Sequence, residues 1–137
     1  MTPLLLDTCA AIWLAEDEPV ASSVIEAIDR AAADRIPIFV SPMSAWEVGL
    51  LSARGRLIMS MSPLAWFEAL LDVPGIELAE LSVKILIASS FLPGTAPRDP
   101  ADRIIAATAR EGGYQLVTRD RVLLDYAEQG HVQALAC

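Results

Sequence analysis

Two aspartates, Asp7 and Asp120, directly follow short apolar runs that are typical of buried strands. In a sheet flanked by helices, the carboxyl ends of the strands form the edge at which ligands bind. Carboxylates at such an edge can hold a cation or exchange a proton, which are the tasks of acidic groups in hydrolytic sites. We therefore expect Asp7 and Asp120 to lie at one edge of the same sheet.

Two further acids, Glu47 and Asp102, fall on the apolar faces of expected helices. Glu47 shares its face with Leu50 and Leu51, and Asp102 lies one turn before Ile105. An unpaired buried carboxylate costs several kcal/mol, so each needs an arginine, a proton or a cation beside it. Both positions therefore indicate a polar site at the inner side of a helix.

Each acid also has a simpler explanation when it is taken alone. Asp120 can cap the helix that follows it, Asp7 can stabilise a turn, and Glu47 can lie at the margin of its apolar stripe. Asp102, in the first turn, can interact favourably with the helix dipole, and Asp99 can cap the same helix. For Asp99 the capping role is preferred, and a role as a metal ligand or beside one is the second choice. These alternatives stay open for each residue.

The four acids together favour a metal site. Like charges at short range force protonation or demand a counter-ion, and a set of oxygen ligands suits Mg²⁺ or Mn²⁺ better than zinc. We predict Asp7 and Asp102 as the primary metal ligands, with Glu47 and Asp120 completing the coordination directly or through water. The expected chemistry is metal-assisted hydrolysis, in which the ion activates a bound water.

Short apolar segments alternate with helical segments along the chain, which predicts an α/β fold with a parallel sheet covered on both faces. Because the chain has 137 residues, one domain spanning residues 1–137 is expected. The expected strands are 3–6, 38–40, 76–78, 114–118 and 131–135. The expected helices are 10–16, 22–34, 41–55, 62–71, 82–91, 99–111 and 120–126.

The composition, with 54% hydrophobic and 20% charged residues, is that of a globular protein. The longest stretch without charge, residues 85–97, is too short for a bilayer span and is interrupted by proline and glycine. Nothing at the N-terminus resembles a signal peptide, so a cytoplasmic location is expected. The two cysteines, Cys9 and Cys137, have no C-x-x-C spacing, which favours reduced thiols over a disulfide or a zinc site.

The net charge of −8 argues against a partner with a phosphate backbone, unless a bound divalent cation inverts the charge of the site. Half of the ten basic residues lie between residues 98 and 121, and arginine suits bidentate contact with phosphate. Ordinary surface positions explain these arginines equally well. Arg98 and Arg119, on expected site-side loops, are the first candidates, ahead of Arg103, Arg110 and Arg121.

The single histidine, His131, argues against a metal-free mechanism with a histidine acid and base, because that scheme needs two positioned groups. We expect it to be structural or at the surface. The large aromatic residues Trp13, Trp46, Trp66 and Phe67 are expected to pack in the core or at an interface rather than to stack on bases. The high apolar content also favours a face covered by a second copy or by an amphipathic partner segment.

Four segments resemble the PIN-domain family, and in particular the VapC-type toxins of bacterial toxin-antitoxin pairs. They are L-L-L-D-T-C-A at 4–10, S-A-W-E-V at 44–48, R-D-P-A-D-R-I-I-A-A-T-A at 98–109 and L-V-T-R-D at 116–120. The resemblance extends over nearly the whole chain, and the block at 98–109 is its most specific part. The chain departs from the pattern at Pro97, where relatives often carry a histidine.

The resemblance implies a three-layer sandwich of helices around a parallel sheet of about five strands. It also implies a Mg²⁺-dependent endoribonuclease that leaves a 5′-phosphate and a 3′-hydroxyl and is held by a cognate antitoxin protein. Asp7, Glu47, Asp102 and Asp120 match the acidic quartet of the family one by one. RNA is thus the expected substrate, a homodimer is expected, and an antitoxin arginine reaching into the acidic pocket is an economical means of inhibition.

Two other classes of function compete with this interpretation. A phosphoryl-transfer domain of the receiver or phosphatase kind also places an aspartate after its first strand, but the chain has no D-x-D at residues 7–9. Its only lysine, Lys84, falls in an expected helix rather than after a late strand. A catalytically silent PIN-like binding module, which keeps the fold and binds a partner, is the alternative from outside the enzymes.

Overall fold

One parallel sheet forms the centre of the computed structural model, which describes all residues from 1 to 137. β1 (Leu4–Leu6) lies in the middle, between β2 (Ile38–Val40) and β4 (Gln115–Thr118), while β3 (Ile76–Leu78) and β5 (Gln133–Ala136) form the edges. Every pairing is parallel, which confirms the predicted fold class. Because all the strands run the same way, their carboxyl ends meet at a single edge of the sheet.

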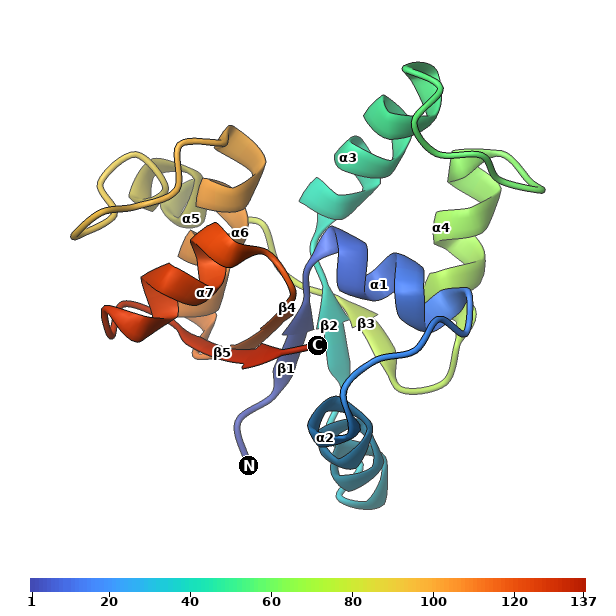
Figure 1. Cartoon of the computed structure of the whole chain (residues 1–137), viewed down its shortest axis with the longest axis horizontal. Helices are drawn as coiled ribbons and strands as arrows, with labels where there is room; N and C mark the ends of the chain where they lie inside the picture. The colour runs from blue at the N-terminus through green and yellow to red at the C-terminus, as the bar shows by residue number, and fades with distance from the viewer.

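Helices cover both faces of this sheet (Figure 1). Leu4 and Leu6 pack into a core formed with the first four helices, whereas Leu5 packs into a second core formed with the last two. Successive strand side chains point to opposite faces, so a run of three leucines serves both cores. The helices are α1 (Thr8–Ala15), α2 (Ser22–Ala33), α3 (Pro42–Ala53), α4 (Pro63–Asp72), α5 (Val83–Ala88), α6 (Pro100–Gly112) and α7 (Arg121–Glu128).

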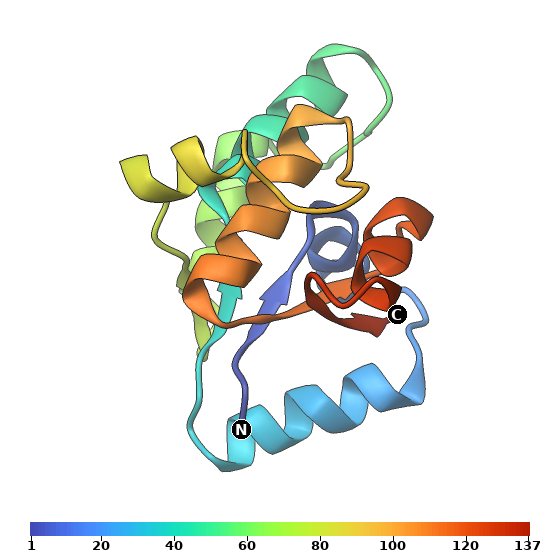
Figure 2. The ribbon, with the colours of Figure 1, turned by 90° about the vertical axis from the view of Figure 1, so that its left-hand side faces the viewer.

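The two halves of the molecule differ in the helices they carry. Figure 1 shows α5, α6 and α7 on the left of the sheet and α1, α3 and α4 on the right. Both views place α2 at the bottom, near the N-terminus and away from the first turns of α3 and α6 (Figure 2). None of the helices combines the length and the apolar composition that a membrane-spanning helix requires.

Local capping residues explain where three of the helices begin. The side chains of Ser41, Ser62 and Asp99 each accept a hydrogen bond from a backbone N–H in the first turn, and a proline follows each cap. At the other end, α6 is followed by Gly113, whose φ of 69° is in the left-handed region that favours glycine. The predicted boundaries of α3, α4 and α6 are therefore confirmed to within two residues.

The helix predicted over residues 82–91 is shorter than expected, since α5 ends at Ala88. Arg103 on α6 donates from Nε to the carbonyl of Ser89 at 2.9 Å and from Nη1 to the carbonyl of Pro97 at 2.8 Å. These bonds tie both ends of the following segment to α6. The prediction was wrong at this end because a distant arginine, rather than a local signal, decides the path of the chain.

Candidate active site

Asp7 lies at the junction of β1 and α1, where it caps the helix. Its Oδ1 accepts a hydrogen bond from the backbone N–H of Ala10 at 2.8 Å, and its Oδ2 accepts one from the buried hydroxyl of Thr118 at the end of β4. The residue is only 6% exposed. Both oxygens are thus oriented by donors that the parallel pairing of β1 with β4 brings together.

Asp120 lies beside Asp7 because Thr118 contacts both residues. The Thr118 hydroxyl oxygen accepts a hydrogen bond from the backbone N–H of Asp120 at 3.0 Å. Oδ1 of Asp120 accepts one from the N–H of Leu123 at 3.0 Å. Asp120 therefore caps α7, which is the structural role considered for it in the sequence analysis. Capping uses only one carboxylate oxygen, and the residue is exposed at the sheet edge. The capping role and a role in the site are therefore compatible.

Glu47 on α3 is joined to the first helix by a hydroxyl group. The Thr8 hydroxyl donates to Oε1 of Glu47 at 2.6 Å and lies 2.9 Å from the hydroxyl of Ser44, and both Thr8 and Ser44 are buried. This charge-assisted hydrogen bond fixes one oxygen of a half-buried carboxylate. The sequence indicated that a carboxylate on this inner helical face needs a partner. The partner of Glu47 is Thr8 and not an arginine.

Asp102 lies in the first turn of α6, and its carboxylate has the fewest hydrogen-bond partners of the four acids. Its backbone N–H donates to Oδ1 of Asp99 at 3.0 Å, which confirms the capping role of Asp99. The carboxylate of Asp102 itself accepts no hydrogen bond and forms no ion pair. It is therefore free to turn about its side-chain bonds toward a ligand.

All four predicted acids line one cavity of about 350 Å³ at the carboxyl end of the sheet, so the structure brings the whole predicted set together. Asp99 lines it as well, next to its capping role. The ion pairs of the molecule, Lys84–Glu111 and Arg121 with Asp125 and Glu128, lie elsewhere and neutralise none of these acids. The cavity is lined by Asp7, Thr8, Cys9, Trp13, Glu47, Asp99, Asp102, Ile105, Arg119 and Asp120.

Burial and mutual repulsion change the acidity of this set. Desolvation raises the pKa of Asp7, Glu47 and Asp102, and the charges of the neighbouring acids raise each pKa further. The hydrogen bonds from Thr118 and Thr8 oppose the rise for Asp7 and Glu47. Asp102 has no such bond, and its pKa rises from 3.8 to about 7. An unneutralised charge is thus most costly at Asp102.

The donor set fits a hard cation in kind. It consists of carboxylate oxygens whose ionised forms repel one another, and oxygen ligands without sulfur or imidazole suit Mg²⁺ or Mn²⁺. No group of three or more His, Cys, Asp or Glu side chains is arranged so that it could hold a metal ion as it stands. Asp102, whose carboxylate accepts no hydrogen bond, would have to turn toward the other acids for the set to close on an ion.

Cys9 and Trp13 are among the lining residues of this cavity that were not predicted as part of the site. Cys9 lies two residues after Asp7, and partial burial of its thiol together with the nearby carboxylates raises the pKa of the thiol to about 11. It therefore stays protonated and adds no charge. Trp13 was expected to pack in the core or at an interface, but its ring lies against the guanidinium of Arg119 on the cavity wall. Helical spacing does not reveal either position, because it depends on how α1 leaves the sheet.

The five arginines between residues 98 and 121 fall into different environments. Arg119 lines the cavity, as expected of a site-side residue, whereas Arg98 does not. Arg103 braces the segment between α5 and α6, and Arg110 donates to the carbonyl of His131. Arg121 pairs with acids of its own helix. Only one of the five therefore stands where it can meet a ligand of the acidic cavity.

The remaining residues named in the sequence analysis lie outside the acidic cavity. His131 lies outside the cavity with its ring 5.1 Å from that of Tyr126, which confirms its expected structural role. Trp66 and Phe67 are buried in the larger core, as predicted. Trp46 is 53% exposed in this chain and therefore lies outside the core. Of the two locations predicted for it, the interface stays a prediction.

The fold and the acidic cavity define an α/β protein with a carboxylate site at the carboxyl edge of a parallel sheet. The chain matches the PIN domain over residues 4–129 and belongs to that family. It is 32% identical to Ribonuclease VapC22 of Mycobacterium tuberculosis over 124 residues, which cover 90% of this chain and 91% of the relative.

Solved structures share the fold at lower sequence identity. The chain superposes on VapBC2 from Rickettsia felis bound to a DNA fragment from their promoter with a TM-score of 0.66 and 15% identity, covering 97% of each chain. For the DNA-bound VapBC from Salmonella typhimurium the TM-score is 0.67 with 17% identity, covering 99% of this chain and 98% of the other. FitAcB from Neisseria gonorrhoeae gives 0.56 with 21% identity, covering 96% of each chain.

The raised pKa of Asp102 predicts a pH-dependent stability of the metal-free protein. The folded state keeps the carboxyl group of Asp102 protonated up to about pH 7, whereas the unfolded chain loses this proton near pH 3.8. The contribution of the bound proton to the free energy of unfolding is therefore lost as pH rises through the folded pKa. Asp102→Asn should therefore be more stable than the wild type at pH 8, by about 1–2 kcal/mol after discounting for solvent screening. The difference should shrink toward pH 4.

Urea denaturation in the presence of a chelator measures this difference at each pH. Asp29→Asn, on α2 and outside the cavity, is the matched control and should show no such change. If the unfolding free energies of Asp102→Asn and the wild type differ by the same amount from pH 4 to pH 8, the raised pKa of Asp102 is contradicted.

Proposed function

We propose that this chain is a Mg²⁺-dependent endoribonuclease that acts in the cytoplasm as the toxin of a toxin-antitoxin pair. The observation that carries the proposal is the convergence of Asp7, Glu47, Asp102 and Asp120, from four distant segments, on one cavity without an ion pair to neutralise them. Membership of the PIN-domain family and the likeness to a relative named as a ribonuclease support the same activity. The free thiols Cys9 and Cys137 fit the location.

Asp7 and Asp102 would hold the ion, with Glu47 and Asp120 completing the coordination directly or through water. The ion, when bound, polarises the scissile phosphate and lowers the pKa of a water molecule. Thr118 and Thr8 keep the carboxylates of Asp7 and Glu47 oriented, so little rotational freedom is lost when substrate binds.

The remaining oxygen of Glu47 is available for proton transfer, since Thr8 binds Oε1 alone. Oε2 accepts a proton from the attacking water, the water oxygen bonds to phosphorus, and the bond from phosphorus to the 3′ oxygen breaks. The leaving 3′ oxygen takes up a proton from solvent water, which leaves a 3′-hydroxyl and a 5′-phosphate. His131 lies outside the cavity, so no histidine pair competes for this role.

Replacement of a predicted ligand tests the proposal. Asp7→Asn keeps an oxygen for the cap of α1 but removes the charge, so Mg²⁺-dependent cleavage of single-stranded RNA should fall by at least about a hundredfold. Thermal unfolding should show an intact fold, and chelation should abolish cleavage by the wild type. Asp29→Asn, which removes an acid from α2, should cleave normally.

The alternatives give other outcomes in the same assay. A silent binding module would leave RNA intact with or without Mg²⁺, and a phosphoryl-transfer domain would act on a phosphate donor instead. Cleavage by Asp7→Asn at the wild-type rate would disprove the assignment of this residue.

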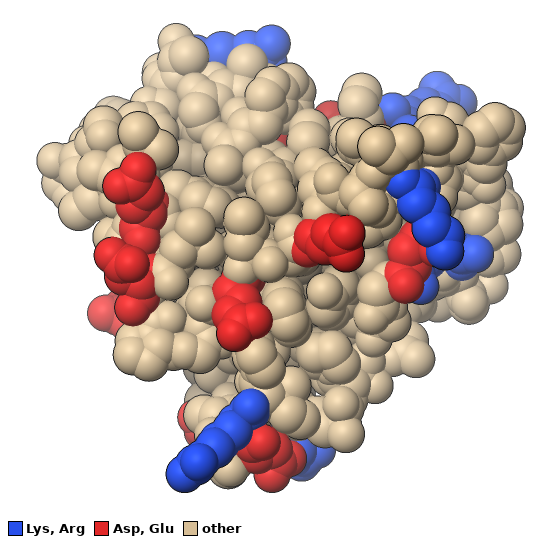
Figure 3. Space-filling view, turned by 180° about the vertical axis from the view of Figure 1, so that it is seen from behind, with Lys and Arg blue, Asp and Glu red and all other residues tan.

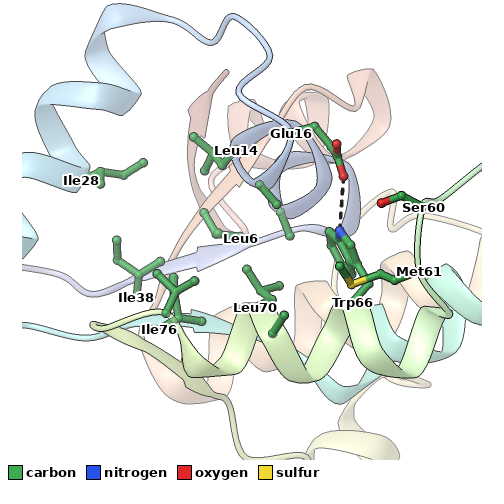
Figure 4. A pocket seen from close by; sticks show the side chains of 14 residues that line it. Leu6, Leu14, Glu16, Ile28, Ile38, Ser60, Met61, Trp66, Leu70 and Ile76 are labelled. Carbon is green, nitrogen blue, oxygen red and sulfur yellow. Dashed lines mark hydrogen bonds between the residues drawn. The ribbon is translucent and has the colours of Figure 1, made fainter.

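An apolar cavity of about 570 Å³ supports the proposed antitoxin partner (Figure 4). Leu14, Leu70 and Ile76 point into it from α1, α4 and β3, and twelve of its fourteen lining residues are hydrophobic. At its rim, Glu16 accepts a hydrogen bond from the indole of Trp66 at 3.3 Å. Such a surface suits the apolar face of an amphipathic segment with a basic residue near Glu16. Three related solved structures are described as VapBC or FitAB assemblies.

A charge at this cavity should weaken the proposed complex. Ala69 is exposed and lines the cavity, so Ala69→Arg places a charged side chain there without opening the core. We expect its affinity for the cognate antitoxin protein, measured by titration calorimetry, to fall about tenfold or more. Ala33→Arg on α2, outside the cavity, is the control. Equal affinities of the two variants would count against this surface.

Exposed apolar side chains around α5 support the proposed homodimer. Val83 and Ile87, one turn apart on α5, are 72% and 58% exposed, and Phe91 just beyond it is 80% exposed. Seen from behind, the molecule shows charged side chains as separate groups, with broad areas free of Lys, Arg, Asp and Glu between them (Figure 3). Exposed apolar side chains on and just after one short helix favour contact with a second copy.

A single charge within this surface should prevent dimer formation. Ile87→Glu buries a carboxylate in the proposed interface, so light scattering should give a dimer mass for the wild type and a monomer mass for the variant. Leu64→Glu, 70% exposed on α4, should remain dimeric. A monomeric wild type at micromolar concentration would refute the homodimer.

A further inference from the structure

Arg119 is the only basic residue among the ten that line the acidic cavity. Its guanidinium carbon lies 3.9 Å from the centre of the Trp13 ring. Nε donates to the carbonyl of Cys137 at 2.9 Å, and Nη2 donates to the carbonyl of Pro19 at 3.2 Å. Contacts from three separate parts of the chain therefore hold an exposed side chain in one orientation.

None of the carboxylates of the cavity pairs with Arg119. Asp120 follows it in the chain and other acids line the same cavity, yet no ion pair joins them to the guanidinium. Its partners are the backbone oxygens of Cys137 and Pro19 and an aromatic ring, and Nη1 donates no hydrogen bond. One edge of the planar fork is therefore free, which is the geometry that binds an anion through two oxygens.

The position of this free edge matters because the substrate is a polyanion. A cavity lined by five carboxylates repels every phosphate of an approaching strand, and a metal ion compensates only at the scissile group. A fixed cation on the wall offsets the repulsion one phosphate away. Because Trp13 and the two backbone oxygens already restrain the side chain, less conformational entropy is lost on binding.

We propose that Arg119 binds a phosphate next to the scissile one in the RNA strand, and that Trp13 is a positioning residue that holds the guanidinium in place. This inference rests on the proposed ribonuclease function. It separates Arg119 from the other four arginines of its region, none of which lines the cavity.

Binding of a labelled single-stranded RNA oligonucleotide to the Asp7→Asn protein tests the proposal without cleavage. Adding Arg119→Ala should raise the Kd about tenfold, as expected for loss of a charged hydrogen bond. Loss of one phosphate contact should also make the slope of log K against log salt concentration shallower by about 0.7. A purely structural role would lower the unfolding temperature without changing this slope.

Further variants separate charge from geometry. Arg119→Lys should keep the salt slope but bind more weakly than arginine, because lysine lacks the planar fork. Trp13→Phe should bind nearly as well as tryptophan, whereas Trp13→Ala should weaken binding and keep the slope, since the charge remains. Arg30→Ala, which removes a charge from α2 far from the cavity, is the control and should change neither quantity.

An unchanged Kd and slope for folded Arg119→Ala would overturn the proposal. So would a change in the Mg²⁺ requirement of cleavage with no change in RNA affinity, because Arg119 would then act only as a counter-charge to the acids. If Arg119→Ala does not fold, Arg119→Lys decides, and equal affinity of lysine and arginine overturns the fork contact. Failure of the wild type to cleave RNA would instead refute the proposed function, which the binding experiment does not measure.

Discussion

The hydroxyl group of Thr118 donates to Asp7, which lies 111 positions earlier in the chain, and accepts from the backbone N–H of Asp120, two residues further on. This contact exists because β1 and β4 are parallel neighbours at the centre of the sheet. It also keeps two carboxylates side by side that would otherwise move apart. The acidic cavity, the caps of α1 and α7 and the orientation of Asp7 all depend on it.

The gathered carboxylates are a destabilising feature that the rest of the fold offsets. Buried leucines on both faces of the sheet and two aliphatic cores stabilise the folded state, while the acids have raised pKa values and no ion pairs. Only hydroxyl groups and helix N–H groups support them. Strain kept at one site in this way is typical of positions retained for function, because a neutral residue would be more stable there.

Sequence reasoning worked where the deciding signal is local. Strand positions followed from apolar runs, and the starts of α3, α4 and α6 followed from Ser-Pro or Asp-Pro pairs. It failed at the end of α5, where Arg103 decides, and it did not place Trp13 on the cavity wall, because the surroundings of this residue depend on the packing of whole helices. The four acids could be predicted to meet because parallel strands share one edge, but the hydroxyl groups of Thr118 and Thr8 could not be paired with Asp7 and Glu47 from spacing alone.

The strand order has a consequence for how the protein is made. Because β1 pairs with β4 on one side, Asp7 cannot share a cavity with Asp102 and Asp120 until β4 and Asp120 have left the ribosome. A nascent chain that stops before β4 lacks the strand that brings Asp7 beside Asp120. The acidic site is therefore assembled in one late step of synthesis, although its first carboxylate is among the earliest residues to be made.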